Sequence, residues 1–246
     1  MRTVPLKPIR SAAEIANVWL QIIAIVAIAG RYLPWWLLPF AGVIIAARQY
    51  ALGVLLHEAQ HSLLHPRRQI NDWIGRWLLA APLWSDFAES RAHHLAHHTY
   101  LGDPFRDPDY PLYAGSWLDH RAAARSDPDA ILVAQFLIAT TCAFITWVWW
   151  GAALWLVPLL LAGIFDRLRI LCEHSSPTGR IWMHRSNVIE RFFFAPFHMN
   201  HHAEHHIWPY LPHYQLTNTT ETLAALMPPA EWARGTYIAH LRELLR

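Results

Sequence analysis

The chain has 246 residues, of which 54% are hydrophobic and only 15% charged, and its mean hydropathy is +0.15. This composition excludes disordered, collagen-like and highly charged coiled-coil proteins, and a formal net charge of +2 gives no reason to expect a nucleic-acid partner. Two cysteines, Cys142 and Cys172, cannot form a disulfide framework or a four-cysteine zinc site. Histidine is the unusual residue, with 17 copies in uneven clusters. The composition therefore indicates a membrane protein with a metal site.

The first long apolar region runs from Ile15 to Leu56, where only Arg31 and Arg48 carry a charge. A bilayer core of about 30 Å requires roughly 20 apolar residues in a helix, so this region is long enough for two spans. We place them at residues 13–31 and 33–56. The region also continues too far for a cleaved signal peptide. Because a cation in lipid is costly, Arg48 is expected either to face the interior of the bundle or to reach an interface.

A second apolar region, residues 130–165, contains no Asp, Glu, Lys, Arg or His. As a single helix it would measure about 54 Å, which is too long for one crossing. Trp149, Trp150 and Gly151 near its middle predict a turn at the membrane interface. Two further spans are therefore expected, at residues 130–149 and 151–168. Pro158 falls inside the returning helix, where a neighbouring helix must satisfy the freed carbonyl.

The predicted fold is an all-α integral membrane protein, a single domain over residues 1–246, with four transmembrane helices in two hairpins. Of the 20 Lys and Arg, 18 lie on one side in this topology, counting Arg167 at the end of the fourth span. The positive-inside rule places that side in the cytoplasm, so residues 57–129 and 169–246 form a cytoplasmic helical cap. Within the cap, the apolar patch Trp73–Trp84 predicts an interfacial helix. The residues after Pro229 predict a short amphipathic helix, either on the membrane surface or packed against the protein.

Three histidine clusters lie outside the apolar spans, and the topology puts all three on the same side of the membrane. Their members are His57 and His61; His94, His97 and His98; and His202, His205 and His206. Residues three and four apart share a helix face, so each cluster directs its imidazoles to one side. Eight imidazoles exceed the four ligands of a structural zinc site, so two ions are expected. Imidazole alone does not identify the metal.

The first cluster, His57-Glu58-Ala59-Gln60-His61, also matches the zinc metalloprotease motif, in which Glu58 would act as general base. That alternative leaves the other two clusters unexplained. Glu58 is otherwise expected to orient an imidazole. Soluble di-iron bundles need two Glu-x-x-His motifs, and the sequence has only Glu58 with His61, which excludes that architecture.

In order, spacing and position relative to the spans, the three clusters resemble the histidine boxes of the membrane fatty acid desaturase family. The segment Tyr100–Asp109 is similar to the one that follows the family's second box, and His205–Pro209 with Pro212 is similar to the one after its third. The resemblance covers most of the chain. It implies an O2-dependent, non-haem di-iron oxidoreductase that abstracts hydrogen from an aliphatic chain of a lipid or lipid-like substrate to form a double bond.

The resemblance also implies a set of ligands for two iron ions. The family supplies one more histidine just after the fourth span, and here His174 takes that place. The implied metal ligands are His57, His61, His94, His97, His98, His174, His202, His205 and His206. The side chains expected to support them are Glu58, His93, Asp107, Asp109, Glu173, Asn200 and His201. Metal-bound histidine usually donates its other nitrogen to a carboxylate, which is the reason for the aspartates, with loop capping as the alternative.

No flavin, nicotinamide, haem or iron–sulfur pattern is present in the sequence, so electrons must come from a separate donor such as a ferredoxin or a cytochrome b5-like protein. Arg180, Arg185 and Arg191 are expected to meet either an acidic donor or phospholipid headgroups. The main alternative is a carotenoid ketolase or hydroxylase, whose chains also resemble this one. Glu173-His174 and the run Asn200–His202 favour an acyl desaturase over these enzymes. A desaturase of an amphiphilic metabolite is a third possibility, because an interior Arg48 would suit a polar head group. A non-catalytic metal transporter would instead carry its histidines within the spans.

Overall fold

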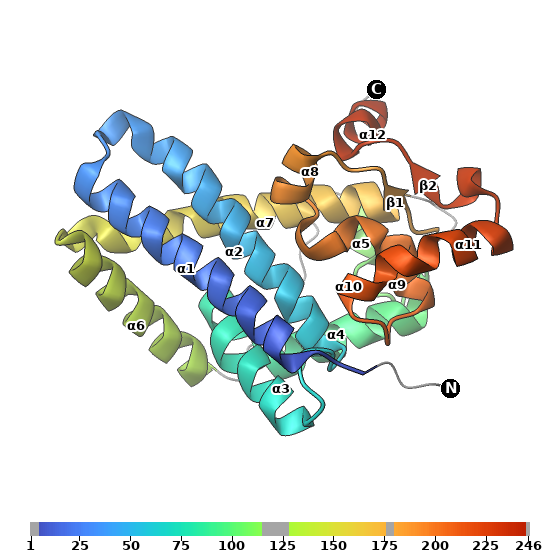
Figure 1. Ribbon diagram of the computed structural model, residues 1–246, viewed down its shortest axis with the longest axis horizontal. Coiled ribbons are helices and arrows are strands. Elements are labelled where there is room, and N and C mark those ends of the chain that lie inside the picture. Colours follow the sequence, from blue (N-terminus) through green and yellow to red (C-terminus); the bar gives the residue numbers. More distant parts are fainter. Residues whose placement is uncertain (1–4, 115–127, 176–179, 245–246) are drawn as a thin grey trace. The chain divides into compact units, whose positions relative to one another are not determined.

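The computed structural model describes residues 5–114, 128–175 and 180–244, which are mostly helical (Figure 1). The chain divides into two compact units. We call Leu6–Glu89 with Arg125–Ile164 the helical unit, and Met1–Pro5, Ser90–Ala124 and Phe165–Arg246 the histidine unit. Helices α4 and α7 each contribute residues to both units.

The helical unit is built from long helices and the short helices that join them. Its elements are α1 (Pro8–Tyr32), η1 (Trp35–Leu37), α2 (Leu38–Gln60), α3 (Arg68–Ile74), η2 (Gly75–Ala80), η3 (Ala81–Leu83), α6 (Pro128–Thr146), η4 (Trp149–Ala152) and the first part of α7 (Ala153–His174).

The histidine unit is built from shorter elements. They are most of α4 (Phe87–Tyr100), α5 (Tyr110–Ala114), the end of α7, β1 (Met183–His184), α8 (Val188–Phe193), η5 (Pro196–His201), α9 (His202–Ile207), α10 (His213–Leu216), η6 (Thr217–Thr219), α11 (Thr220–Leu226), η7 (Pro229–Glu231), β2 (Ala233–Arg234) and α12 (Tyr237–Leu244).

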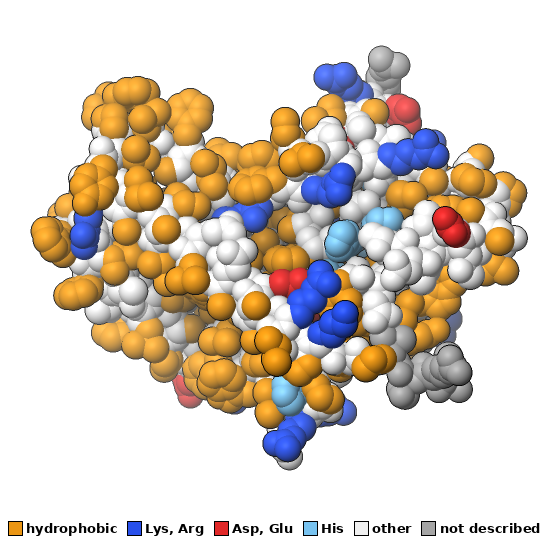
Figure 2. Space-filling model, in the orientation of Figure 1, with side chains coloured by type: hydrophobic (Ala, Val, Ile, Leu, Met, Phe, Trp, Pro, Cys, Tyr) orange, Lys and Arg blue, Asp and Glu red, His pale blue; other side chains and the backbone are white. Residues whose placement is uncertain are grey.

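Three helical segments are long and apolar enough to cross a membrane. They are Pro8–Tyr32, Trp35–Gln60 and Pro128–Thr146, and their mean hydropathies are 1.9, 1.5 and 1.8. The apolar stretch of α7 is interrupted after Phe165 by Asp166, Arg167 and Arg169, and α7 is not among these segments. Hydrophobic side chains cover much of the visible surface of the helical unit (Figure 2). The described part of the chain therefore contains three membrane-length helices.

One face of α1 forms part of the core of the helical unit. Ile15, Val18, Ile22 and Val26 follow one another at intervals of three and four residues and are all buried. Residues on the opposite face, such as Leu20 at 64% exposure, point outward although they are apolar. An outward-facing apolar side is suited to lipid rather than water.

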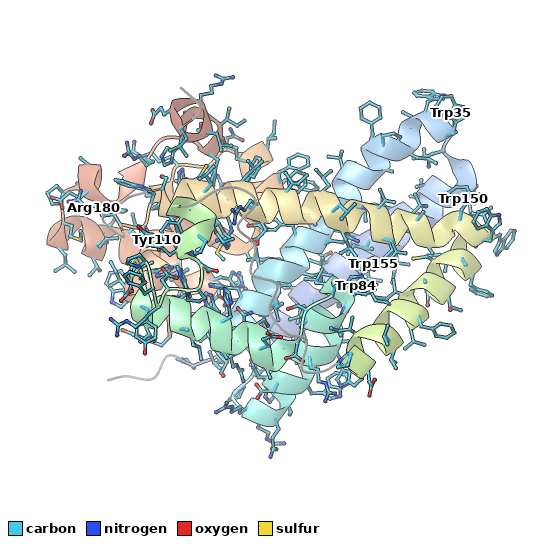
Figure 3. All side chains as sticks on the ribbon, turned by 180° about the vertical axis from the view of Figure 1, so that it is seen from behind. Trp35, Trp84, Tyr110, Trp150, Trp155 and Arg180 are labelled. Carbon is cyan, nitrogen blue, oxygen red and sulfur yellow. The ribbon has the colours of Figure 1, made fainter. Side chains whose placement is uncertain are left out.

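The chain turns between α6 and α7 at the position that the sequence predicts, although α6 ends three residues earlier than expected, at Thr146. Trp147 adopts a left-handed backbone conformation with φ of 61°, which ends the helix. Gly151 is required there, because a Cβ atom would lie 2.7 Å from the carbonyl oxygen of Cys142 and closer still to the hydroxyl of Thr146. Trp150 at this turn and Trp35 lie at the same end of the helical unit (Figure 3).

A chain of buried hydrogen bonds connects four elements of the helical unit. The amide of Gln49 donates to the carbonyl of Trp155 (2.7 Å), and the Trp155 indole donates to Gln135 Oε1 (3.1 Å). The amide of Gln135 in turn donates to the carbonyls of Ala81 (3.0 Å) and Pro82 (2.7 Å). The Trp155 carbonyl lies three residues before Pro158, in the turn that a proline ring disturbs. A side chain from α2 thus supplies a hydrogen bond beside the proline of α7.

The core of the histidine unit lies around the two short strands, which pair in parallel. Its buried members are Ile181, Met183, Ala203, Leu223 and Trp232. Asn187 and Glu190 form a capping box at the start of α8, and Glu190 Oε1 also accepts the backbone N–H of Ile238 (3.0 Å). These contacts attach α8, α9 and α12 to one framework.

Candidate metal centre

The last two turns of α4 carry the second histidine cluster. His97 is 2% exposed, and its Nδ1 donates to Asp107 Oδ1 at 2.8 Å. Because a carboxylate only accepts, this bond fixes the tautomer and leaves the lone pair on Nε2. Among the described residues, His97 Nε2 is buried and has no hydrogen-bond partner. A buried lone pair with no donor is what a metal-binding imidazole presents when the ion is left out.

A strained turn in η5 precedes the third cluster. Phe197 and His198 both have positive φ, 54° and 59°, although neither is glycine. Each such residue costs about 1–2 kcal/mol, so the surrounding packing must hold the turn in place. The turn leads into α9, in which His202, Ala203, Glu204 and His205 are all buried.

Within the histidine unit the imidazoles form two groups. Group 1 contains His94, His98 and His205, and group 2 contains His97, His174 and His206, with His202 and Glu173 beside His174. The ligand atoms within each set lie within 4.8 Å of one another. The nearest pairs are His205 and His98 (Nε2 to Nε2, 3.2 Å) in group 1, and His174 and His202 (3.0 Å) and His206 and His202 (3.1 Å) in group 2.

The second and third clusters are therefore each divided between the groups. His94 and His98, four residues apart, stay together, and so do His202 and His206. His97 and His205 belong to the opposite group from their neighbours. At 3.6 residues per turn, residues four apart diverge by only about 40° around the helix axis, whereas residues three apart diverge by about 60° in the other direction. One helix can therefore serve both groups.

The spacing of the nitrogens fits a shared cation. Two nitrogens bound to one ion at about 2.0–2.1 Å stand about 2.9–3.4 Å apart for right-angled to tetrahedral geometry. The Nε2–Nε2 distances of 3.0, 3.1 and 3.2 Å lie in that range. A single proton on His202 Nε2 can point to His174 or to His206, but not along both contacts. The residues present thus fit a metal ion better than they fit hydrogen bonds among themselves.

Three imidazoles of group 2, those of His174, His202 and His206, are held in the neutral form that binds metals. Burial, followed by the neighbouring imidazoles, lowers the pKa of His174 and of His206 well below the ordinary histidine value. The pKa of His202 is lowered well below that value for the same reasons. Metal ligands must be deprotonated, so the environment prepares these side chains for an ion at neutral pH.

The aspartates after α4 orient the imidazoles of that helix. Asp107 accepts His97 Nδ1, the hydroxyl of Tyr113 (2.5 Å) and the backbone N–H of Gly102 (2.9 Å). Burial favours the protonated acid, but these hydrogen bonds outweigh it and hold the pKa of Asp107 below its usual value. Asp109 Oδ1 in turn accepts His93 Nε2 at 2.6 Å. The loop that the sequence places after the second cluster thus supplies carboxylates to two of its histidines.

Glu173 lies beside group 2 in a buried polar network. Its Oε2 accepts Arg169 Nη1 (2.6 Å) and lies 3.7 Å from His202 Nε2, and its Oε1 accepts the hydroxyl of Tyr237 (2.5 Å). Burial raises the pKa of Glu173 to about 7, against the opposing effect of Arg169 and of the Tyr237 hydroxyl. Glu173 therefore carries its negative charge above neutral pH and offers an oxygen to the same space as the imidazoles.

The remaining predicted residues belong to the end of α2 and to η5. His57 and His61 occupy the end of α2 in the helical unit, with ring centroids 5.1 Å apart, and Glu58 between them is buried. Asn200 donates to the backbone carbonyl of His184 (3.1 Å). His201 Nδ1 donates to Glu204 Oε1 (2.9 Å), which also accepts the hydroxyl of Thr220 (2.8 Å).

Several side chains around the groups are absent from the set that the sequence predicts. Glu204 had a sequence signal, because it lies three residues after His201 inside the third cluster. Arg169, four residues before Glu173 on a helix, had one as well. No sequence pattern predicts the contacts of Tyr113 and Tyr237. Each hydroxyl donates to a carboxylate that the fold brings close, and the spacing along the sequence does not indicate the pair.

Comparison with known proteins agrees with this geometry. A family model described as "Fatty acid desaturase" matches residues 33–127 and 113–237. Dihydrorhizobitoxine desaturase from Bradyrhizobium elkanii is 24% identical over 246 aligned positions, covering 79% of this chain and 70% of that protein. Zeaxanthin 4-ketolase from Chlamydomonas reinhardtii is 27% identical over 209 positions, covering 72% of this chain. Beta-carotene ketolase from Haematococcus lacustris is 24% identical over 224 positions, covering 79% of this chain and 66% of that protein.

The relatives differ in length from this chain, which spans only 43% of the zeaxanthin 4-ketolase. The named relatives are oxidoreductases, and the family match covers all three histidine clusters. With its membrane-length helices and grouped imidazoles, the chain belongs to the fatty acid desaturase family, a family of membrane oxidoreductases.

Proposed function

We propose that this protein is a membrane di-iron oxidoreductase that uses O2 to introduce a double bond into the aliphatic chain of a lipid-like substrate. The observation that carries the proposal is the set of neutral imidazoles of His174, His202 and His206, in which the Nε2 of His202 lies 3.0 Å from that of His174 and 3.1 Å from that of His206, with no proton arrangement that satisfies both contacts. Overall, the substrate loses two hydrogens, and O2 is reduced to two waters with two electrons from a separate donor and two protons.

The ligands are divided between two irons. Group 2 holds one ion through His97, His174, His202 and His206, and group 1 holds the other through His94, His98 and His205. His57 and His61 complete group 1. Their support is the i, i+4 spacing at the end of α2, together with the resemblance of this pair to the family's first histidine box.

The protein's own residues prepare the site. Iron, when bound, supplies the oxidising power from O2 that removal of hydrogen from an unactivated C–H bond requires. Asp107 holds His97 in the tautomer whose Nε2 is free of its proton, and Glu173 places a negative charge beside the cationic centre. Burial of His97, His174 and His202 at 2–3% exposure keeps bulk water away from the reacting atoms.

We further propose that residues 151–168, which include the first part of α7, form a fourth span and that the metal site lies on the cytoplasmic side. The support is the uncharged run from Ala153 to Phe165 together with the bias of Lys and Arg along the sequence. An electron donor of the ferredoxin or cytochrome b5 type then reaches the site from the cytoplasm.

Oxygen insertion is the second candidate reaction. The observation that favours it is the similarity to carotenoid ketolases, at 24–27% identity. The zinc metalloprotease alternative has no comparable support, because the family match accounts for all three histidine clusters.

Product analysis separates the two candidates. Lipids and pigments from cells that express the wild-type protein and from cells that express His205→Ala are compared by mass spectrometry. We expect a product lighter than its precursor by two hydrogens, present only with the wild-type protein. A product that gains one oxygen would instead establish hydroxylation, and a gain of one oxygen with loss of two hydrogens would establish ketone formation.

Metal content provides a test that does not depend on the substrate. Purified without oxygen in the presence of iron, the protein is expected to bind about two irons per chain, as two groups of imidazoles require. The double variant His57→Ala/His61→Ala is expected to retain the group 2 ion and lose the other. One zinc per chain and no iron would overturn the di-iron assignment, whereas two firmly held irons in the double variant would remove His57 and His61 from the ligand set.

A further inference from the structure

Tyr113 in α5 is linked to two imidazoles of group 2, to one through Asp107 and to the other by direct ring contact. Its hydroxyl donates to Asp107 Oδ2 at 2.5 Å, and Asp107 Oδ1 accepts His97 Nδ1 at 2.8 Å. Its ring stacks on the imidazole of His174, with centroids 5.3 Å apart and planes inclined by 28°. One side chain therefore acts on two imidazoles that belong to the same group but come from different helices, α4 and α7.

The hydroxyl of Tyr113 also completes the hydrogen bonding of Asp107. A carboxylate has about four lone-pair sites, and Asp107 uses them for His97, Tyr113 and the backbone N–H groups of Gly102 and Asp109, both at 2.9 Å. With every site occupied, the carboxylate has a single orientation, and so has His97.

We infer that Tyr113 is a positioning residue for the group 2 metal ion, setting His97 through Asp107 and His174 through ring stacking. This inference rests on the proposed function, because it requires an ion in group 2. Loss of the hydroxyl frees one site on Asp107 and lets its carboxylate rotate, which changes the direction of the His97 lone pair. The ring alone still packs on His174.

The chain provides a matched control in the same short helix. Tyr110 contacts Tyr113 edge-on, with centroids 5.5 Å apart, and the described hydrogen bonds of Asp107 do not include its hydroxyl (Figure 3). Tyr110→Phe and Tyr113→Phe remove the same atom from neighbouring turns of one element. Only the second removal changes a side chain that holds an imidazole.

The experiment is a titration of full-length metal-free protein in detergent with Co2+, following the visible absorption of the bound ion, and with Fe2+ under nitrogen. We expect Tyr113→Phe to bind one ion as the wild type does and the other about 10- to 100-fold more weakly, the usual effect of removing a contact behind a metal ligand. The Co2+ spectrum of the weakened site is expected to change. Tyr110→Phe should bind both ions normally, and the metal-free melting temperature should be the same for all three proteins.

Equal affinities and spectra for Tyr113→Phe and the wild type would overturn the inference. It would also be overturned if Tyr113→Phe lowered the melting temperature of the metal-free protein and weakened both ions together, because the residue would then serve only the fold. A wild-type protein that binds no ion contradicts the proposed function itself, which separates that failure from the failure of this inference.

Discussion

Replacing His97 by alanine is expected to reduce product formation by more than about 100-fold while the chain remains folded and inserted. Even contacts behind a metal ligand change affinity or activity by 10- to 100-fold, and loss of the ligand itself exceeds that range. The contacts of His97 define both its ring orientation and its tautomer. Its Nδ1 donates to Asp107, and its Nε2 is buried near His174 and His206. The measurement is product formed per mole of purified protein, with the melting temperature determined in parallel.

His65→Ala provides the matched control for this prediction. His65 is a histidine outside the three clusters, in the segment that follows α2. Its Nδ1 accepts a hydrogen bond from the backbone N–H of Arg67 at 2.9 Å. This variant is expected to retain full activity. Wild-type turnover by His97→Ala would exclude His97 as a ligand, and equal losses in both variants would mean that the assay reports general damage.

Replacing Glu173 by leucine is expected to lower the free energy of unfolding by about 3–5 kcal/mol, because it leaves the buried guanidinium of Arg169 without its main counter-charge. Glu173 is fully buried and Arg169 is 8% exposed. Arginine does not lose its proton at accessible pH, so the protein cannot escape this cost by neutralising it. The measurement is unfolding in detergent at pH 8, above the pKa of Glu173 of about 7, where the wild-type carboxylate is charged.

The double variant Arg169→Met/Glu173→Leu distinguishes a buried-charge effect from the loss of a metal ligand. Replacing a buried ion pair by apolar side chains of similar volume is often neutral, so most of the stability is expected to return. If the double variant is as unstable as Glu173→Leu, the cost comes from elsewhere, such as the bond from Tyr237. Asp166→Asn is the control, since that carboxylate is 49% exposed and its pair with Arg169 is worth little.

The sequence predicts which residue types form the site better than it predicts which of these residues contact one another. Spacings of three and four residues identify the histidines of α4 and α9, and the family resemblance adds His174. The division of each cluster follows the three- and four-residue spacing along its helix, but which histidines of α4 share a group with which histidines of α9 depends on how the helices meet, and no single-helix pattern contains that information. The hydroxyl of Tyr237 donates to Glu173, which is 64 residues away in the sequence, and the ring of Tyr113 stacks on His174, which belongs to another helix. No local sequence pattern predicts either contact.

Composition predicts where the long apolar helices lie, but not the exact residues at which they end. Apolar runs locate α1, α2 and α6, because membrane-length helices differ in composition from everything around them. Helix α6 ends three residues before the predicted position. The left-handed backbone of Trp147 and the close approach at Gly151 accompany this end, and hydropathy predicts neither of them. The strained pair Phe197 and His198 could not be predicted from the sequence, because phenylalanine does not favour that conformation and histidine adopts it in only a small fraction of cases.

The hydrogen bonds from Gln49 through Trp155 and Gln135 to η3 affect how the helical unit can assemble. A helix that entered the bilayer alone with Gln49 or Gln135 would present an amide to hydrocarbon, which is costly until a partner arrives. The Gln49 amide donates to an element 106 residues later in the chain, whereas the Gln135 amide donates to carbonyls 53–54 residues earlier. Since α7 follows α2 in the chain, the Gln49 amide lacks its Trp155 acceptor until α7 has been synthesised.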